Sequence, residues 1–214
     1  MGGDTMTDPT IKSDKGWWPR NRIALLALVP LAALALAASS YQYRTYYQPN
    51  AFTHVTTASG KSLDYREEFT AKRKPYSRAA RLTLVSLEAK PLGVNASGPT
   101  GARADLWTVE LQFAAKPDVP LEGCTLVLID RQGQVYSEVG RDLMPKLEGA
   151  PSECVPVDAP GPSFDFLGDL TTPQGAARPP SWPVRGQFVL PHGQKPAFVR
   201  VSWKTPYAAL IPVD

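Results

Sequence analysis

Two cysteines and two histidines are the residues of this chain best suited to metal binding or covalent chemistry. Cys124 and Cys154 lie in the same half of the chain, and His54 and His192 are remote from each other. Their spacing matches no known zinc-ligand pattern, so we expect no metal site and no cofactor. A disulfide bond between the two cysteines is the simpler interpretation if this region occupies an oxidising compartment.

No catalytic signature accompanies these residues. The chain contains no Gly-rich phosphate loop, no Gly-x-Ser-x-Gly elbow and no His-Glu-x-x-His motif. Both histidines fall in predicted connections between elements, where a nucleophile and its base lack a rigid support. We therefore expect a protein that is not an enzyme. An envelope hydrolase is the least favoured alternative, and it stays open because sequence does not reveal the distance between two carboxylates.

A long irregular segment, residues 141–184, is the first candidate for a binding surface. It contains nine prolines, and long irregular segments of compact domains often bind partners. The candidate partner-binding residues are its large apolar side chains Phe164, Phe166, Leu167, Leu170 and Trp182. The alternative is that this segment docks over one end of the domain as a lid, tied down by Cys154.

A run of basic residues is the second candidate for a binding surface. It consists of Lys72, Arg73, Lys74, Arg78 and Arg81. Such a cluster suits contact with anionic headgroups or polyanions, each charge adding about 1 kcal/mol near such a surface. The alternative is a solvated loop whose charge is partly neutralised by neighbouring glutamates. The formal net charge of the 214 residues is only +3, so we expect no nucleic-acid partner.

One apolar stretch organises the chain around these candidates. Residues 23–43 carry no charged side chain, and a helix of that length spans about 31 Å, close to the hydrocarbon thickness of a bilayer. The basic residues concentrate before it, at Lys12, Lys15, Arg20 and Arg22, which predicts a cytoplasmic amino end. The alternative is a secretory signal cleaved after residues 35–37, Ala-Leu-Ala, which would release a secreted protein.

The remaining chain divides around this transmembrane helix. We expect a disordered cytoplasmic tail over residues 1–22, a connector over residues 44–60 and one extracytoplasmic domain over residues 61–214. Seven stretches with strand character are bounded by turn residues: 63–69, 81–89, 106–114, 124–129, 134–139, 186–190 and 197–203. The fold class is therefore all-β, an immunoglobulin-like antiparallel β-sandwich of about seven strands preceded by one transmembrane helix.

Two hairpin motifs carry a family resemblance. The stretches Leu-Ile-Asp-Arg-Gln-Gly-Gln-Val-Tyr and Gly-Gln-Phe-Val-Leu-Pro-His-Gly-Gln-Lys-Pro-Ala-Phe-Val-Arg-Val resemble telokin-like, immunoglobulin-like extracytoplasmic domains of bacterial envelope proteins, and the Ala-, Arg- and Pro-rich composition is similar to actinobacterial ones. The resemblance implies a fold and no catalytic residue. We therefore expect a membrane-anchored binding module that assists another membrane or envelope protein. The alternative is a domain that binds a solute or a cell-wall polymer.

Overall fold

A computed structural model describes residues 17–47, 51–92, 104–139, 154–165, 167–172 and 175–213. The chain separates into two compact units, residues 1–49 and residues 50–214. Each unit is described by itself. The predicted disordered tail covers residues 1–22, and its first 16 residues lie outside the described part, so their disorder stays a prediction. For residues 17–22 the prediction is wrong, because these residues are helical.

The described part of the first unit is helical. Helix α1 (Trp17–Gln42) continues through Pro30 and is followed by a short π-helical turn, η1 (Tyr43–Tyr47). Residues 21–45 contain a window of mean hydropathy 2.3. Apolar residues lie on all sides of α1, so the helix has no polar face. It is long and apolar enough to span a membrane.

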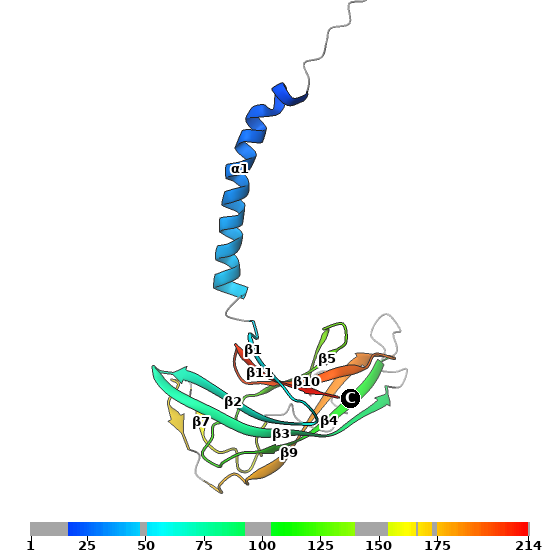
Figure 1. Ribbon diagram of the computed structural model, residues 1–214. Coiled ribbons are helices and arrows are strands. Elements are labelled where there is room, and N and C mark those ends of the chain that lie inside the picture. Colours follow the sequence, from blue (N-terminus) through cyan, green and yellow to red (C-terminus); the bar gives the residue numbers. More distant parts are fainter. Residues whose placement is uncertain are drawn as a thin grey trace, which may run out of the picture. The chain divides into compact units, whose positions relative to one another are not determined.

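The second unit consists of β-strands (Figure 1). Its described residues form β1 (His54–Thr57), β2 (Ser62–Ala71), β3 (Lys74–Pro91), β4 (Ala104–Ala114), β5 (Thr125–Asp130), β6 (Val135–Ser137), β7 (Ser163–Phe164), β8 (Leu170–Thr171), β9 (Ser181–Pro191), β10 (Pro196–Ser202) and β11 (Tyr207–Pro212). One sheet has the order β1-β11-β10-β5-β6, a second has the order β2-β3-β4-β9, and β7 pairs with β8. Every pair among these strands is antiparallel except the parallel pair β1 and β11.

The two larger sheets share one hydrophobic core. Val109, Leu111 and Phe113 of β4 are fully buried, and the residues between them are partly exposed. This is the period-two alternation of a strand with one face against a core. Leu128 of β5 and Val199 of β10 belong to the same buried cluster from the other sheet. Burial of each such side chain contributes about 1.5–3 kcal/mol, so this cluster is the main source of stability.

The predicted all-β architecture with one preceding apolar helix is confirmed, but four strands lie outside the seven predicted stretches. Strands β7 and β8 have two residues each, too few to show a period. Strand β11 has the pattern Tyr-Ala-Ala-Leu-Ile-Pro, which does not alternate. Strand β1 lies within the predicted connector over residues 44–60, and that prediction is corrected for residues 54–57, which pair with β11.

The predicted disulfide is present and joins two parts of the domain. Cys124, directly before β5, is bonded to Cys154, and their Cα atoms are 5.7 Å apart. The indole Nε1 of Trp182 on β9 donates a hydrogen bond to the carbonyl oxygen of Cys154 at 2.9 Å. The disulfide and this hydrogen bond together attach the part of the irregular segment around Cys154 to both larger sheets.

Candidate binding surfaces

The β2–β3 hairpin places two of the predicted basic residues on opposite faces of the sheet. Arg78 lies directly across from Glu67, and Arg81 lies directly across from Asp64. Arg78 and Glu67 are buried, with 6% and 2% of their surfaces exposed, whereas Arg81 and Asp64 form an exposed ion pair. The prediction that Arg78 contacts an anionic surface is therefore wrong. It is wrong because residues an odd number of positions apart on a strand point to opposite faces.

Arg78 belongs to a buried hydrogen-bond network. Its Nη1 and the Tyr65 hydroxyl both donate to the carboxylate of Glu67, and its Nε donates to the carbonyl oxygen of Pro120 at 2.7 Å. The guanidinium also lies 5.1 Å from the ring centroid of Trp203. Burial raises the pKa of Tyr65 to about 12 and lowers the pKa of Arg78 to about 10. Both groups therefore keep their protons at neutral pH, and the network is structural.

The other basic residues lie at the turn of the same hairpin. Lys72 and Arg73 form the two-residue turn between β2 and β3, with φ angles of 47° and 64°. This left-handed conformation suits Asn and Gly in such hairpin turns, so two long basic residues are an unfavourable choice for stability alone. Lys72, Arg73 and Lys74 are all exposed. The Lys72 ammonium forms an ion pair with Asp169 at 2.5 Å.

Residues of the irregular segment lie beside this turn. The ring of Phe164 packs edge-on against Phe69 and Tyr76, with centroid distances of 5.6 Å and 5.0 Å. These aromatic contacts hold the β7–β8 segment against the outer end of the β2–β3 hairpin. Leu167 and Leu170 are left 55% and 40% exposed. We call Lys72, Arg73, Lys74, Leu167 and Leu170 the tip surface.

The predicted partner-binding residues therefore separate into three groups. Leu167 and Leu170 are exposed and Phe164 is half-buried, so these three lie together near the tip surface. Trp182 is only 3% exposed and packs against Phe113 in the core, so it is not available to a partner. That part of the prediction is wrong because Trp182 falls on the inward face of β9. Phe166 lies outside the described residues.

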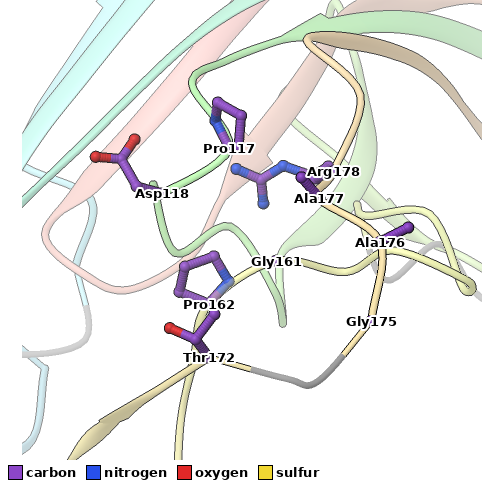
Figure 2. A pocket seen from close by; sticks show the side chains of 9 residues that line it. All are labelled: Pro117, Asp118, Gly161, Pro162, Thr172, Gly175, Ala176, Ala177 and Arg178. Carbon is purple, nitrogen blue, oxygen red and sulfur yellow. The ribbon is translucent and has the colours of Figure 1, made fainter.

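A buried arginine joins three loops beside a cavity of about 310 Å³ (Figure 2). Arg178 is 1% exposed, and its Nη atoms donate to the carbonyl oxygens of Pro160, Lys116 and Val119 at 2.7–3.0 Å. Its guanidinium also lies 4.8 Å from the Trp182 ring centroid. Figure 2 shows the guanidinium near Pro117 and Gly161, with the carboxylate of Asp118 directed away from it. Three of the five donors already have backbone acceptors, so Arg178 acts as a cross-link between loops.

Gly161→Ala is expected to destabilise the domain because it removes the space that Arg178 occupies. A Cβ at position 161 would lie 2.8 Å from Nη1 of Arg178, and Gly161 has a φ of +78°. Strain in the left-handed region and displacement of the guanidinium should together cost about 2–3 kcal/mol. Urea unfolding followed by tryptophan fluorescence would measure this loss.

Gly133→Ala is the matched control. Gly133 has a φ of +82°, and no atom lies within 4 Å of the position that a Cβ would take there. Only the backbone strain of about 1–2 kcal/mol is therefore expected. Equal losses for the two variants would show that the contact between Gly161 and Arg178 contributes nothing.

The two histidines lie on different parts of the domain. Nδ1 of His192, after β9, is 3.0 Å from Oδ1 of Asp105, and this hydrogen bond lowers the pKa of Asp105. His54 on β1 packs against the ring of Tyr207, with centroids 5.0 Å apart. Over the described part of the chain, no group of three or more His, Cys, Asp or Glu side chains is placed to hold a metal ion.

The loop containing His192 meets the β5–β6 turn at one end of the sheets. Asp130 closes that turn by accepting hydrogen bonds from the backbone N–H groups of Gln132 and Gln134, both at 2.9 Å. Its other carboxylate oxygen accepts from the Gln194 amide at 3.0 Å. The sequence pattern predicts the hairpin turn after Asp130, but nothing in it indicates the contact with Gln194. The same holds for Arg178, whose neighbours in sequence are Ala and Pro residues that carry no signal.

Neither a family model, nor a curated protein, nor a solved structure matches this chain. The resemblance to telokin-like domains therefore stays a prediction that rests on two hairpin motifs.

Proposed function

We propose that this chain is a single-pass membrane protein that carries an immunoglobulin-like, telokin-like β-sandwich on the extracytoplasmic side. Helix α1 serves as the membrane anchor, and the basic residues before it keep the amino end in the cytoplasm. The disulfide supports an oxidising location for the domain. The domain acts by binding another membrane or envelope protein and carries out no catalysis.

The observation that carries this proposal is the tip surface. Three exposed cations and two exposed leucines lie together at the outer end of the β2–β3 hairpin. The non-glycine residues in the left-handed turn are unfavourable for folding, and such conformations cluster at functional positions. The leucines supply apolar contact and the cations supply charge, so the surface suits a partner segment with acidic and apolar side chains.

The tip surface is preorganised for such a partner. Phe69, Tyr76 and Phe164 support it from below through edge-on ring contacts, and the Lys72–Asp169 ion pair joins its two segments. A surface that is already ordered loses little conformational entropy when it binds. Because the patch is small, we expect a weak or transient complex, or one that is extended by further contacts.

Photo-crosslinking in membranes tests this function. A photoreactive amino acid replaces Leu167 in the full chain, and the matched control places it at Val157, an apolar residue that is 86% exposed in a different loop. We expect a discrete protein adduct from position 167, at least fivefold above the adduct from position 157. Replacing Lys72 and Lys74 with glutamate should reduce the adduct at 167 by a similar factor, because charge attraction is reversed.

Two outcomes would contradict the proposal. Equal adducts from positions 167 and 157 would show that the tip surface has no specific partner. An adduct whose mass identifies a lipid would show that this surface docks on the bilayer instead of on a protein.

A further inference from the structure

A second concave site lies where two loops meet at the end of the sheets. The β5–β6 turn and the β9–β10 connection both border it, because the last residue of β5, Asp130, pairs with the first residue of β10, Pro196. The cavity has a volume of about 410 Å³, within the range of small-molecule sites. Its lining residues are Trp107, Arg131, Gln132, Gln194, Lys195 and Pro196, with Gly193 and Val213.

The two loops around this cavity are fixed to each other. The Gln194 amide donates to Asp130 at 3.0 Å and lies 3.4 Å from the side-chain oxygen of Gln132. The Tyr136 hydroxyl donates to the same carboxylate oxygen of Asp130 at 3.1 Å. Gly193 N–H donates to Asp105 at 3.2 Å, which attaches the second loop to β4. These hydrogen bonds preorganise the walls of the cavity.

The polar groups that line the cavity are predominantly hydrogen-bond donors. Lys195 is exposed and has no ion pair among the described residues, and Arg131 adds a second positive charge to the lining. Nε1 of Trp107 is buried and has no hydrogen-bond partner. Leaving a buried N–H unpaired costs about 1–3 kcal/mol, so a small shift of the lining that lets an acceptor oxygen reach this group would be favoured.

Among the described residues, the carboxylates that border the two loops of the cavity already accept hydrogen bonds. Both oxygens of Asp130 accept hydrogen bonds, one from its own turn and the other from Gln194. Asp105 is bonded to His192 and to the Gly193 N–H. Among the described residues, no carboxylate lines the cavity. A neutral sugar, which presents as many donors as acceptors, would therefore find few partners for its hydroxyl hydrogens.

We propose that this cavity binds a small organic carboxylate with a flat apolar body. Lys195 pairs with the carboxylate, and Arg131 adds positive charge to the same wall. The indole N–H of Trp107 supplies a further donor once the lining shifts to admit an acceptor oxygen. The Trp107 ring, Pro196 and Val213 provide apolar walls for the rest of the molecule. This site is separate from the tip surface, so the proposed ligand binding does not depend on the proposed partner binding.

The test follows indole N–H resonances of the full-length, ¹⁵N-labelled protein in detergent micelles. The chain has five tryptophans, and a Trp107→Phe variant identifies the resonance of Trp107 by its loss. Phenylacetate is titrated as the probe, and phenylacetamide is its neutral control of the same shape. We expect phenylacetate to shift the Trp107 resonance saturably and to bind at least tenfold more tightly than phenylacetamide. The Trp182 and Trp203 resonances should stay in place, because their indoles already donate to the carbonyls of Cys154 and Leu121.

A pair of lysine variants locates the charge that matters. Lys195→Gln should weaken phenylacetate binding about tenfold, as expected for one charge-assisted contact. Lys204→Gln is the matched control, because Lys204 is also exposed but lies in the β10–β11 connection and does not line the cavity. The proposal is overturned if phenylacetate causes no saturable shift, if phenylacetamide binds equally well, or if the two lysine variants weaken binding to the same extent.

Discussion

Replacing Arg78 with methionine is expected to lower the free energy of unfolding of the β domain by about 3–5 kcal/mol. The variant leaves the Glu67 carboxylate buried with only the Tyr65 hydroxyl to compensate for its loss of hydration. It also frees the carbonyl oxygen of Pro120, which accepts from Arg78 in the native protein. Urea unfolding of the full chain in micelles, followed by tryptophan fluorescence, would measure the loss.

The same hairpin contains a matched control for this prediction. Arg81→Met breaks the ion pair between Arg81 and Asp64, which has two hydrogen bonds at 2.6 Å and 2.8 Å and is exposed to solvent. Exposed pairs contribute about 0–1 kcal/mol, so this variant should be nearly as stable as the native protein. If Arg78→Met and Arg81→Met lower the free energy of unfolding equally, burial of the Arg78–Glu67 pair is not the reason for the loss.

A double variant tests whether the cost of Arg78→Met comes from leaving the Glu67 charge buried without its partner. Combining Glu67→Leu with Arg78→Met removes both buried charges, so the double variant should be more stable than Arg78→Met alone. Additive losses from the two single substitutions would contradict a direct coupling between Glu67 and Arg78.

Removing the disulfide is the second change with a large expected effect. Replacing Cys124 and Cys154 with serine should lower the free energy of unfolding by about 3–4 kcal/mol, because the bond closes a loop of about 30 residues in the unfolded chain. The loss should also loosen the irregular segment around position 154, because its covalent link to the start of β5 is removed while the hydrogen bond from Trp182 to its carbonyl oxygen stays. Denaturation midpoints with and without dithiothreitol would measure the effect.

The serine variant provides its own control. Dithiothreitol should destabilise the native protein to the level of the double serine variant and should leave that variant unchanged. If the reductant does not alter the native protein while the variant is less stable, then the cysteines contribute through packing at the buried position 154 and not through the covalent bond.

Much of the architecture could be predicted from the order of residues along the chain. The apolar stretch predicts helix α1 because any helix of that composition lacks a polar face. Alternation at period two predicts β4, because a strand with one face on a core must repeat in that way. The disulfide follows from a count of two cysteines. Helix α1 and β4 follow from the local pattern of residues, and the disulfide follows from the number of cysteines. None of the three requires knowledge of which segments contact each other.

The strands outside these patterns could not be predicted, because their partners determine them. Strand β11 lies between β1 and β10, and its six residues are either buried or partly buried, so its sequence shows no alternation of apolar and polar residues. Strand β1 forms within a polar stretch because its backbone pairs in parallel with the edge of β11. The pairing of β7 with β8 depends on the ring of Phe164 packing against the β2–β3 hairpin.

Residue order alone was enough to specify the apolar helix, the β-rich class, the disulfide and the two clusters of basic and apolar residues. Which members of those clusters face solvent depends on the folded arrangement. Arg78 and Arg81 look equivalent in the sequence, yet burial of one and exposure of the other follow from the register of β3 against β2. Trp182 and Leu167 are both large apolar residues of the irregular segment, yet Trp182 is buried and Leu167 is exposed. The physical reason is that exposure depends on which face packs against the other sheet, and that packing joins residues far apart in the chain.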